Sequence, residues 1–312
     1  MLRYLLDQSL QKQLQIVFTT HAPTMIEGLP LGAVKVFALD PATEKFIVHQ
    51  DRSAEEAFLS IGHRVTNKLA IRVEDRLAKA LIEEAMKKMC ADERLPHEFP
   101  ALVDVVFYPG GVGSMKNDII RYSREADINV RQIFDGSERP KETIELQKLT
   151  TEENQPSSLK QRLEQVVGQK ITFAIDGGKG GGRADQELAA IHSYIRFWNE
   201  RCFFLPFDVP EEVLWDRDLA KAQLEPVLSS PAELELELDR LDGCVGKVRF
   251  QELAKTLYNE NASAQILAIQ TYFLKAWLNR GEAAEIKQVE EIILKIRELV
   301  GFINGKSCSV ES

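Results

Sequence analysis

The sequence predicts an α/β protein built on a parallel sheet, and two observations lead to this class. From about residue 68 onward, apolar runs rich in β-branched residues alternate with amphipathic helical runs, which is the order that builds parallel sheets. Beyond Pro210 the chain is helical almost throughout, with amphipathic runs at 248–259, 263–279 and 283–302. We therefore expect a sheet-containing domain followed by a helical domain.

Size and composition predict a cytoplasmic protein of two or three domains. The 312 residues exceed one ordinary core, and no run approaches the roughly 18 apolar residues that a membrane span needs. The first ten residues lack the apolar stretch of a secretory signal. The four cysteines lie far apart and form no CxxC pair, which argues against a zinc ribbon or disulfide framework and indicates a reducing compartment.

The formal net charge of −9 bears on nucleic-acid binding. Proteins that bind the phosphate backbone are usually basic, so this charge counts against such a function without excluding it. A nuclease can be acidic overall when bound metal ions supply local positive charge and its basic residues share one face.

The first 66 residues predict a helix, a strand, a β-hairpin and a polar helical connector. The strand covers Leu14–Thr20, which is apolar and β-branched, and it ends in His21–Ala22–Pro23. The two hairpin strands and the connector are expected at 34–39, 45–49 and 53–66.

The middle of the chain predicts five strands and the helices between them. The helix after the first strand places Leu77, Leu81 and Met86 on one apolar face. Residues 138–170 are rich in Glu, Gln, Lys and Ser, and we expect them to form an exposed, partly helical insertion. The five strands are expected at 69–74, 101–108, 130–135, 170–176 and 202–206, with a helix over 115–125.

Two acidic residues stand at strand ends, Glu74 after the first of these strands and Asp135 after the third. In open α/β sheets ligands gather outside the carboxyl ends of the strands, so both carboxylates would face one crevice. Converging carboxylates repel one another, and a bound divalent metal ion is the usual resolution. The pattern predicts metal-assisted phosphate chemistry; the alternative is a generic doubly wound sheet whose strands end in polar residues.

The spacing of Glu74, the Gly110–Gly111 turn and Asp135 resembles a Toprim domain, the metal-binding fold of topoisomerases, primases and some nucleases. In that family a glutamate ends the first strand, as Glu74 does, and an Asp-x-Asp pair ends the third strand. Asp135 matches the first aspartate of the pair, whereas Ser137 replaces the second and Glu138 stands beside it. The resemblance implies that these four residues hold one or two Mg²⁺ or Mn²⁺ ions, with serine as the weaker, neutral ligand.

The segment Thr19–Pro23 resembles the switch-histidine turn of ABC-type ATPases, in which His21 would contact the γ-phosphate of ATP. An ABC-type ATPase followed by a Toprim domain resembles the OLD (overcoming lysogenization defect) family of nucleases, which includes relatives used in anti-phage defence. No Gly-x-x-x-x-Gly-Lys-Ser/Thr loop occurs, so we expect no ATP hydrolysis from this chain alone. The resemblance implies an ATPase remnant at 1–66, a Toprim domain at 67–215 and a helical domain at 216–312.

Two further residues complete the expected site. Glu211, after the last Toprim strand, resembles an additional metal-site acid of the family, although an acid in a first helical turn also interacts favourably with the helix dipole. The family also uses a lysine downstream of the metal ligands. We expect this to be Lys247, which follows a flexible turn, with Lys255 as the alternative. The Gly177–Gly182 loop could also approach a phosphate backbone closely, with Lys179 and Arg183 supplying positive charge.

Together these observations predict a metal-dependent DNA endonuclease of OLD type within an ATPase-coupled anti-phage or DNA-processing system. The expected partners are DNA, a separate or missing ATPase portion and further copies of this chain in a homo-oligomer, with no membrane. One alternative is a non-catalytic Toprim module, degenerate at Ser137, that serves assembly or nucleic-acid sensing. A weaker alternative is a nucleotide-binding domain using the turn at 110–113, which lacks the Gly-x-Gly-x-x-Gly fingerprint.

Overall fold

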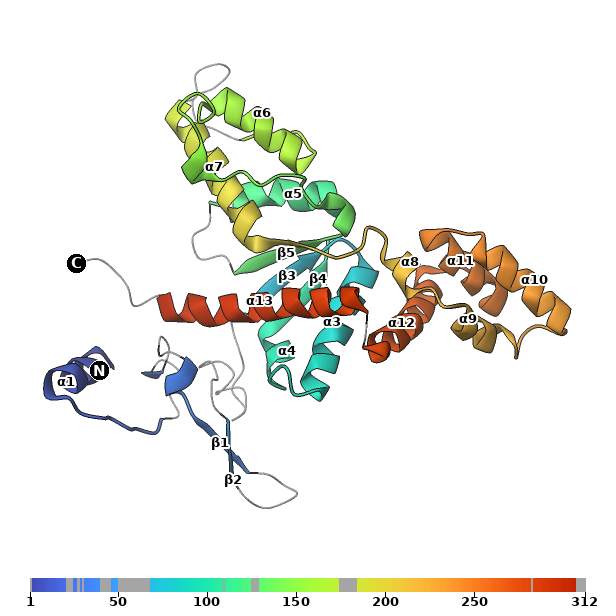
Figure 1. Cartoon of the computed structure of the whole chain (residues 1–312), viewed down its shortest axis with the longest axis horizontal. Helices are drawn as coiled ribbons and strands as arrows, with labels where there is room; N and C mark the ends of the chain where they lie inside the picture. The colour runs from blue at the N-terminus through green and yellow to red at the C-terminus, as the bar shows by residue number, and fades with distance from the viewer. Residues whose placement is uncertain are drawn as a thin grey trace. The chain divides into compact units, whose positions relative to one another are not determined.

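The protein is mixed α/β, as the sequence predicts (Figure 1). The computed structural model describes residues 2–20, 25, 26, 29, 31–39, 46–49, 68–108, 110–124, 129–173, 184–281 and 283–306. By its internal contacts the chain divides into one unit of residues 1–69, 89–104 and 293–312 and a second of residues 70–88 and 105–292.

The first unit contains a β-hairpin where the sequence predicts one. Its strands β1 and β2 pair antiparallel, with Val36 opposite His49. The prediction of a strand at Leu14–Thr20 is wrong, because this segment has no regular structure. A strand needs a partner for its backbone hydrogen bonds, and no described strand pairs with this segment. The elements of this part are α1 (Leu2–Lys12), η2 (Leu31–Ala33), β1 (Val36–Leu39), β2 (Phe46–His49) and α4 (Phe99–Leu102).

Four strands form one sheet, in the order β4-β3-β5-β6. The inner strand β5 runs parallel to both β3 and β6, and Val73 lies beside Ile133. Every residue of β5 is buried, as expected for a strand covered on both faces. The expected strand at 101–108 begins two residues late, because α4 occupies its first positions. The strands are β3 (Leu69–Val73), β4 (Val103–Phe107), β5 (Val130–Phe134) and β6 (Cys202–Phe204).

Helices connect the strands and supply the core. In α3 the three residues predicted to face the core, Leu77, Leu81 and Met86, are buried. Helices α5, α6 and α7 stack beside the sheet in Figure 1. Phe134 of β5 packs against Trp198 of α7 at a centroid distance of 5.5 Å. Helix α5 begins four residues earlier than expected. The helices are α3 (Arg76–Ala91), α5 (Gly111–Tyr122), α6 (Pro156–Val167) and α7 (Ala184–Arg201).

The segment between β5 and α7 differs from its prediction in two ways. It is partly helical, as expected. The prediction that it is an exposed insertion is wrong for α6, which buries Leu159 and Leu163 against α7. The strand expected from Lys170 is absent over 170–173, the part that the structure describes. The backbone N–H of Ile171 donates instead to the Glu164 carboxylate at 3.0 Å, so it is satisfied without a sheet. Two short 3-10 helices precede α6, at η3 (Gly136–Glu138) and η4 (Leu146–Lys148).

The chain after β6 is helical, as predicted. Trp215, Phe250 and Phe273 form its aromatic centre, with Trp215 stacked on Phe273 at a centroid distance of 5.7 Å and Phe250 edge-on to Phe273. None of the described helices is long and apolar enough to cross a membrane. The helices are α8 (Pro210–Leu214), α9 (Arg217–Leu224), α10 (Pro231–Asp242), α11 (Gly246–Tyr258), α12 (Ser263–Arg280) and α13 (Ala284–Lys306).

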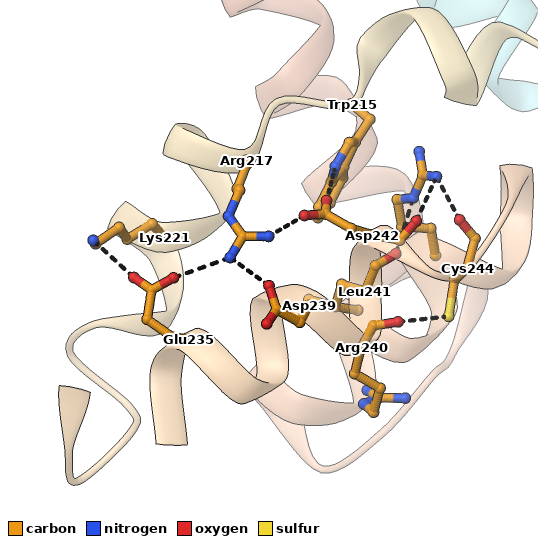
Figure 2. Close-up of polar contacts among 10 residues, drawn as sticks. Trp215, Arg217, Lys221, Glu235, Asp239, Arg240, Leu241, Asp242 and Cys244 are labelled. Carbon is orange, nitrogen blue, oxygen red and sulfur yellow. Dashed lines mark hydrogen bonds and ion pairs between the residues drawn. The ribbon is translucent and has the colours of Figure 1, made fainter. Parts of the chain in front are cut away.

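An ionic network joins α9 to α10 (Figure 2). Arg217 donates to Asp239 at 2.8 Å and to Glu235 at 3.0 Å, and it also pairs with Asp242. The indole N–H of Trp215 donates to Asp242 at 2.8 Å. The network fixes the C-terminal end of α10, from which the loop to α11 departs.

Candidate metal centre

The first two predicted ligands lie side by side at the carboxyl ends of neighbouring strands. Glu74 directly follows β3 and Asp135 directly follows β5. The carboxylate oxygen Oε1 of Glu74 accepts a hydrogen bond of 2.9 Å from the backbone N–H of Asp135. The two residues are 61 positions apart in sequence and are brought together by the parallel pairing of β3 with β5.

The third acidic residue, Glu211, comes from the first turn of α8. The residue is 1% exposed, which is unusual for a glutamate and requires a polar partner. Gln270 of α12, also buried, supplies one by donating from Nε2 to Glu211 Oε1 at 3.3 Å. Gln270 therefore fixes the orientation of this carboxylate.

Lys247 reaches the same region from the start of α11. Its ammonium forms an ion pair of 3.0 Å with the Asp75 carboxylate. The other carboxylate oxygen of Asp75 accepts from the backbone N–H of Ala78 at 2.9 Å and caps the start of α3. Asp75 is thus held at both oxygens and fixes the lysine at the residue that follows Glu74.

Burial and the charges of neighbouring residues act on the pKa of Asp135. Burial, and then the negative charges of Glu74, Asp75 and Glu211, raise the pKa of Asp135 to about 8 from its ordinary 3.8, while Lys247 opposes this rise. A carboxyl group in such surroundings holds its proton near neutral pH unless a cation compensates.

The pKa values of Glu74, Glu211 and Lys247 are also raised. Burial raises the pKa of Glu74, with contributions from Glu138 and Asp75, and burial likewise raises the pKa of Glu211. Burial acts to lower the pKa of Lys247, but the hydrogen bond to Asp75 and the nearby carboxylates outweigh it and raise this pKa. The lysine is therefore a permanent cation within a cluster of carboxyl groups that favour protonation.

A buried arginine braces the loop that presents Lys247. Arg249 donates to the carbonyl oxygens of Leu241 at 3.1 Å and of Cys244, and it pairs with Glu212 at 3.0 Å. The Glu212 carboxylate also accepts from the backbone N–H of Gly246, whose φ of +51° favours glycine. The flexible turn that the sequence predicts is thus a fixed one.

The other two predicted ligands, Ser137 and Glu138, form no hydrogen bond or ion pair with the Glu74 carboxylate in the described part of the chain. Glu138 pairs with Lys116 of α5, whose side chain is only 5% exposed and also donates to the Val167 carbonyl at 2.7 Å. Ser137 is exposed, and no hydrogen bond or ion pair joins it to the other predicted ligands in the described part of the chain.

Three residues singled out in the sequence lie outside the described residues, namely His21, Lys179 and Arg183. Lys255, the alternative to Lys247, is exposed on α11. Of the two lysines, only Lys247 contributes to the electrostatics of Asp135.

The donor chemistry of this cluster fits a hard divalent cation. Glu74, Asp135 and Glu211 are carboxylates, which Mg²⁺ and Mn²⁺ prefer, and a bound cation would relieve the repulsion that raises their pKa values. Over the described ranges, no three His, Cys, Asp or Glu side chains are already arranged around one ion position. Ion binding would therefore require these side chains to reorient.

Sequence reasoning missed four residues that shape the site: Asp75, Lys116, Arg249 and Gln270. Lys116 and Gln270 each carried a signal, because both are polar residues at core-facing positions of amphipathic helices. No protein-family model matches the chain, and no curated protein matches it either.

Proposed function

We propose that this protein is a metal-dependent phosphodiester hydrolase that cleaves DNA. The observation that carries the proposal is geometric: the Glu74 carboxylate accepts a hydrogen bond from the backbone N–H of Asp135, and Lys247 is held by Asp75, the residue after Glu74. In keeping with this arrangement, burial and the charges of Glu74, Asp75 and Glu211 raise the pKa of Asp135. Clusters of groups with strongly perturbed pKa values are typical of catalytic sites. The OLD-type assignment, the coupling to an ATPase and a homo-oligomeric state belong to this proposal and rest on the sequence resemblance.

The proposed roles follow from the contacts of each residue. Glu74, Asp135 and Glu211 would hold a Mg²⁺ or Mn²⁺ ion, which supplies Lewis-acid activation of the phosphate and of a water molecule when it is bound. Lys247, held by Asp75, would donate hydrogen bonds to a phosphate oxygen and stabilise the charge that develops there in the transition state. Gln270 would keep Glu211 pointing toward the ion.

The proposal is tested by plasmid cleavage with and without Mg²⁺ or Mn²⁺. We expect nicked or linear product only with a divalent ion, complete inhibition by EDTA, and loss of activity in Glu74→Gln and Asp135→Asn. Metal-independent cleavage, or full activity of Asp135→Asn, would contradict the proposed centre.

A non-catalytic module for assembly or nucleic-acid sensing is the second candidate. Two observations favour it: Ser137 is neutral and exposed, and Glu138 is already paired with Lys116. Neither residue therefore replaces the family's second aspartate directly. Under this alternative the chain would bind DNA, or copies of itself, without cleaving DNA under any metal condition.

A further inference from the structure

Glu138 and Lys116 form a pair that the proposed mechanism does not use. The Glu138 carboxylate contacts the ammonium of Lys116, and the two side chains are 27% and 5% exposed. Lys116 is also held at its own backbone, since its carbonyl accepts a 2.9 Å hydrogen bond from the hydroxyl of Tyr194. A lysine this deeply buried is rare unless it is paired, so the partner of Lys116 is integral to its position.

The pair is joined to the candidate metal centre through the backbone of η3. The N–H of Glu138 donates to the carbonyl oxygen of Asp135 at 3.1 Å, so Glu138 lies one turn after that predicted ligand. Lys116 is therefore a fixed cation paired with Glu138, the acid next to Ser137.

We propose that Lys116 takes the place of a second divalent ion, so that the centre binds one ion and not two. This inference rests on the proposed metal centre. Five carboxylates are considered at the centre and beside it, and two of them are each paired with a lysine, Glu138 with Lys116 and Asp75 with Lys247. The remaining three are Glu74, Asp135 and Glu211. Mg²⁺ is usually held by one or two protein carboxylates and several waters, so three carboxylates suffice for one ion but fall short of two separate pairs for two ions.

The test is calorimetric titration of Mn²⁺ into the intact chain and three variants. The wild type is expected to bind one ion per chain. The double variant Lys116→Met/Glu138→Gln removes a neutral pair, so it should keep one ion with an affinity within about threefold. Lys116→Met alone frees the Glu138 carboxylate and should bind a second ion. Lys148→Met removes a lysine from the exposed pair with Glu145 and serves as the control, with one ion expected.

Several results would overturn the inference. These are two ions in the wild type, no Mn²⁺ binding, a tenfold or larger loss of affinity in the double variant, and one ion in a folded Lys116→Met protein. If Lys116→Met fails to fold, the stoichiometry of the wild type and the affinity of the double variant still decide. One bound ion without DNA cleavage would support the one-ion centre and overturn the nuclease proposal, so the two failures are distinguishable.

Discussion

Lys247 and Asp75 form an ion pair of 3.0 Å across 172 positions of sequence. The lysine is the second residue of α11, and Asp75 immediately follows Glu74 at the end of β3. The pair joins the helical part of the chain to the sheet edge where Glu74 and Asp135 meet. The contact is the reason that the proposed mechanism uses Lys247 and not Lys255.

Replacing Lys247 should therefore lower the rate of DNA cleavage without changing the affinity for Mn²⁺. We expect Lys247→Met to lower kcat for DNA cleavage by about 10²-fold or more, because a preorganised charge at the phosphate acts mainly in the transition state. Mn²⁺ affinity should change little, since the lysine is not a metal ligand. Lys255→Met, on the same helix but exposed, is the matched control and should retain full activity. Equal losses in both variants would contradict the role of Lys247.

Asp135 should be the residue on which metal binding depends most. Asp135→Asn removes an anionic ligand while keeping its shape, and we expect Mn²⁺ affinity measured by calorimetry to fall at least tenfold. Asp218→Asn removes an equal charge from an exposed position on α9 and should bind Mn²⁺ as the wild type does. Undiminished binding by Asp135→Asn would place the ion elsewhere.

The same carboxyl group predicts how stability depends on pH in EDTA. Burial and neighbouring carboxylates raise the pKa of Asp135 to about 8, above the ordinary 3.8 expected in the unfolded chain. The folded state therefore binds this proton more tightly, and the resulting stabilisation is complete below pH 3.8 and lost as the pH rises through about 8. Thermal melts should show a midpoint that falls between pH 5 and pH 8, with a smaller fall in Asp135→Asn. A flat profile in the wild type would contradict the prediction.

Glycine is required next to Asp135. The N–H of Gly136 donates to the carbonyl of Phe207 at 2.8 Å, and an added Cβ would come within 2.7 Å of the Phe207 backbone. We expect Gly136→Ala to destabilise the protein by about 1–3 kcal/mol, because the backbone of β5 would have to shift. Chemical denaturation measures the loss. Gly113→Ala, in α5 with only the Gln169 side chain at 3.4 Å, should be neutral or slightly stabilising.

The fold and the candidate site were predictable from the sequence to different degrees. Residues that follow a buried strand could be identified, because apolar runs mark β3 and β5 and a polar residue ends each of them. Leu14–Thr20 could not be excluded as a strand, since strand formation depends on a partner strand and not on composition alone. The contacts of Lys116 and Gln270 were not predictable either. Spacing reveals that a polar residue faces the core, but its partner comes from another element.

Because helices supply Glu211 and Lys247, local unfolding of those helices would disassemble the proposed metal centre. Glu211 and Lys247 belong to α8 and α11, whereas Glu74 and Asp135 end strands of the sheet. Local opening of the helices, with the sheet intact, would remove one carboxylate and the lysine together. Hydrogen exchange would detect such a state as amides of α8, α11 and α12 that exchange before those of β5. In the proposed metal centre, binding of a divalent ion would slow that exchange. The ion would stabilise the folded helices, and the folded helices would in turn be needed to bind the ion.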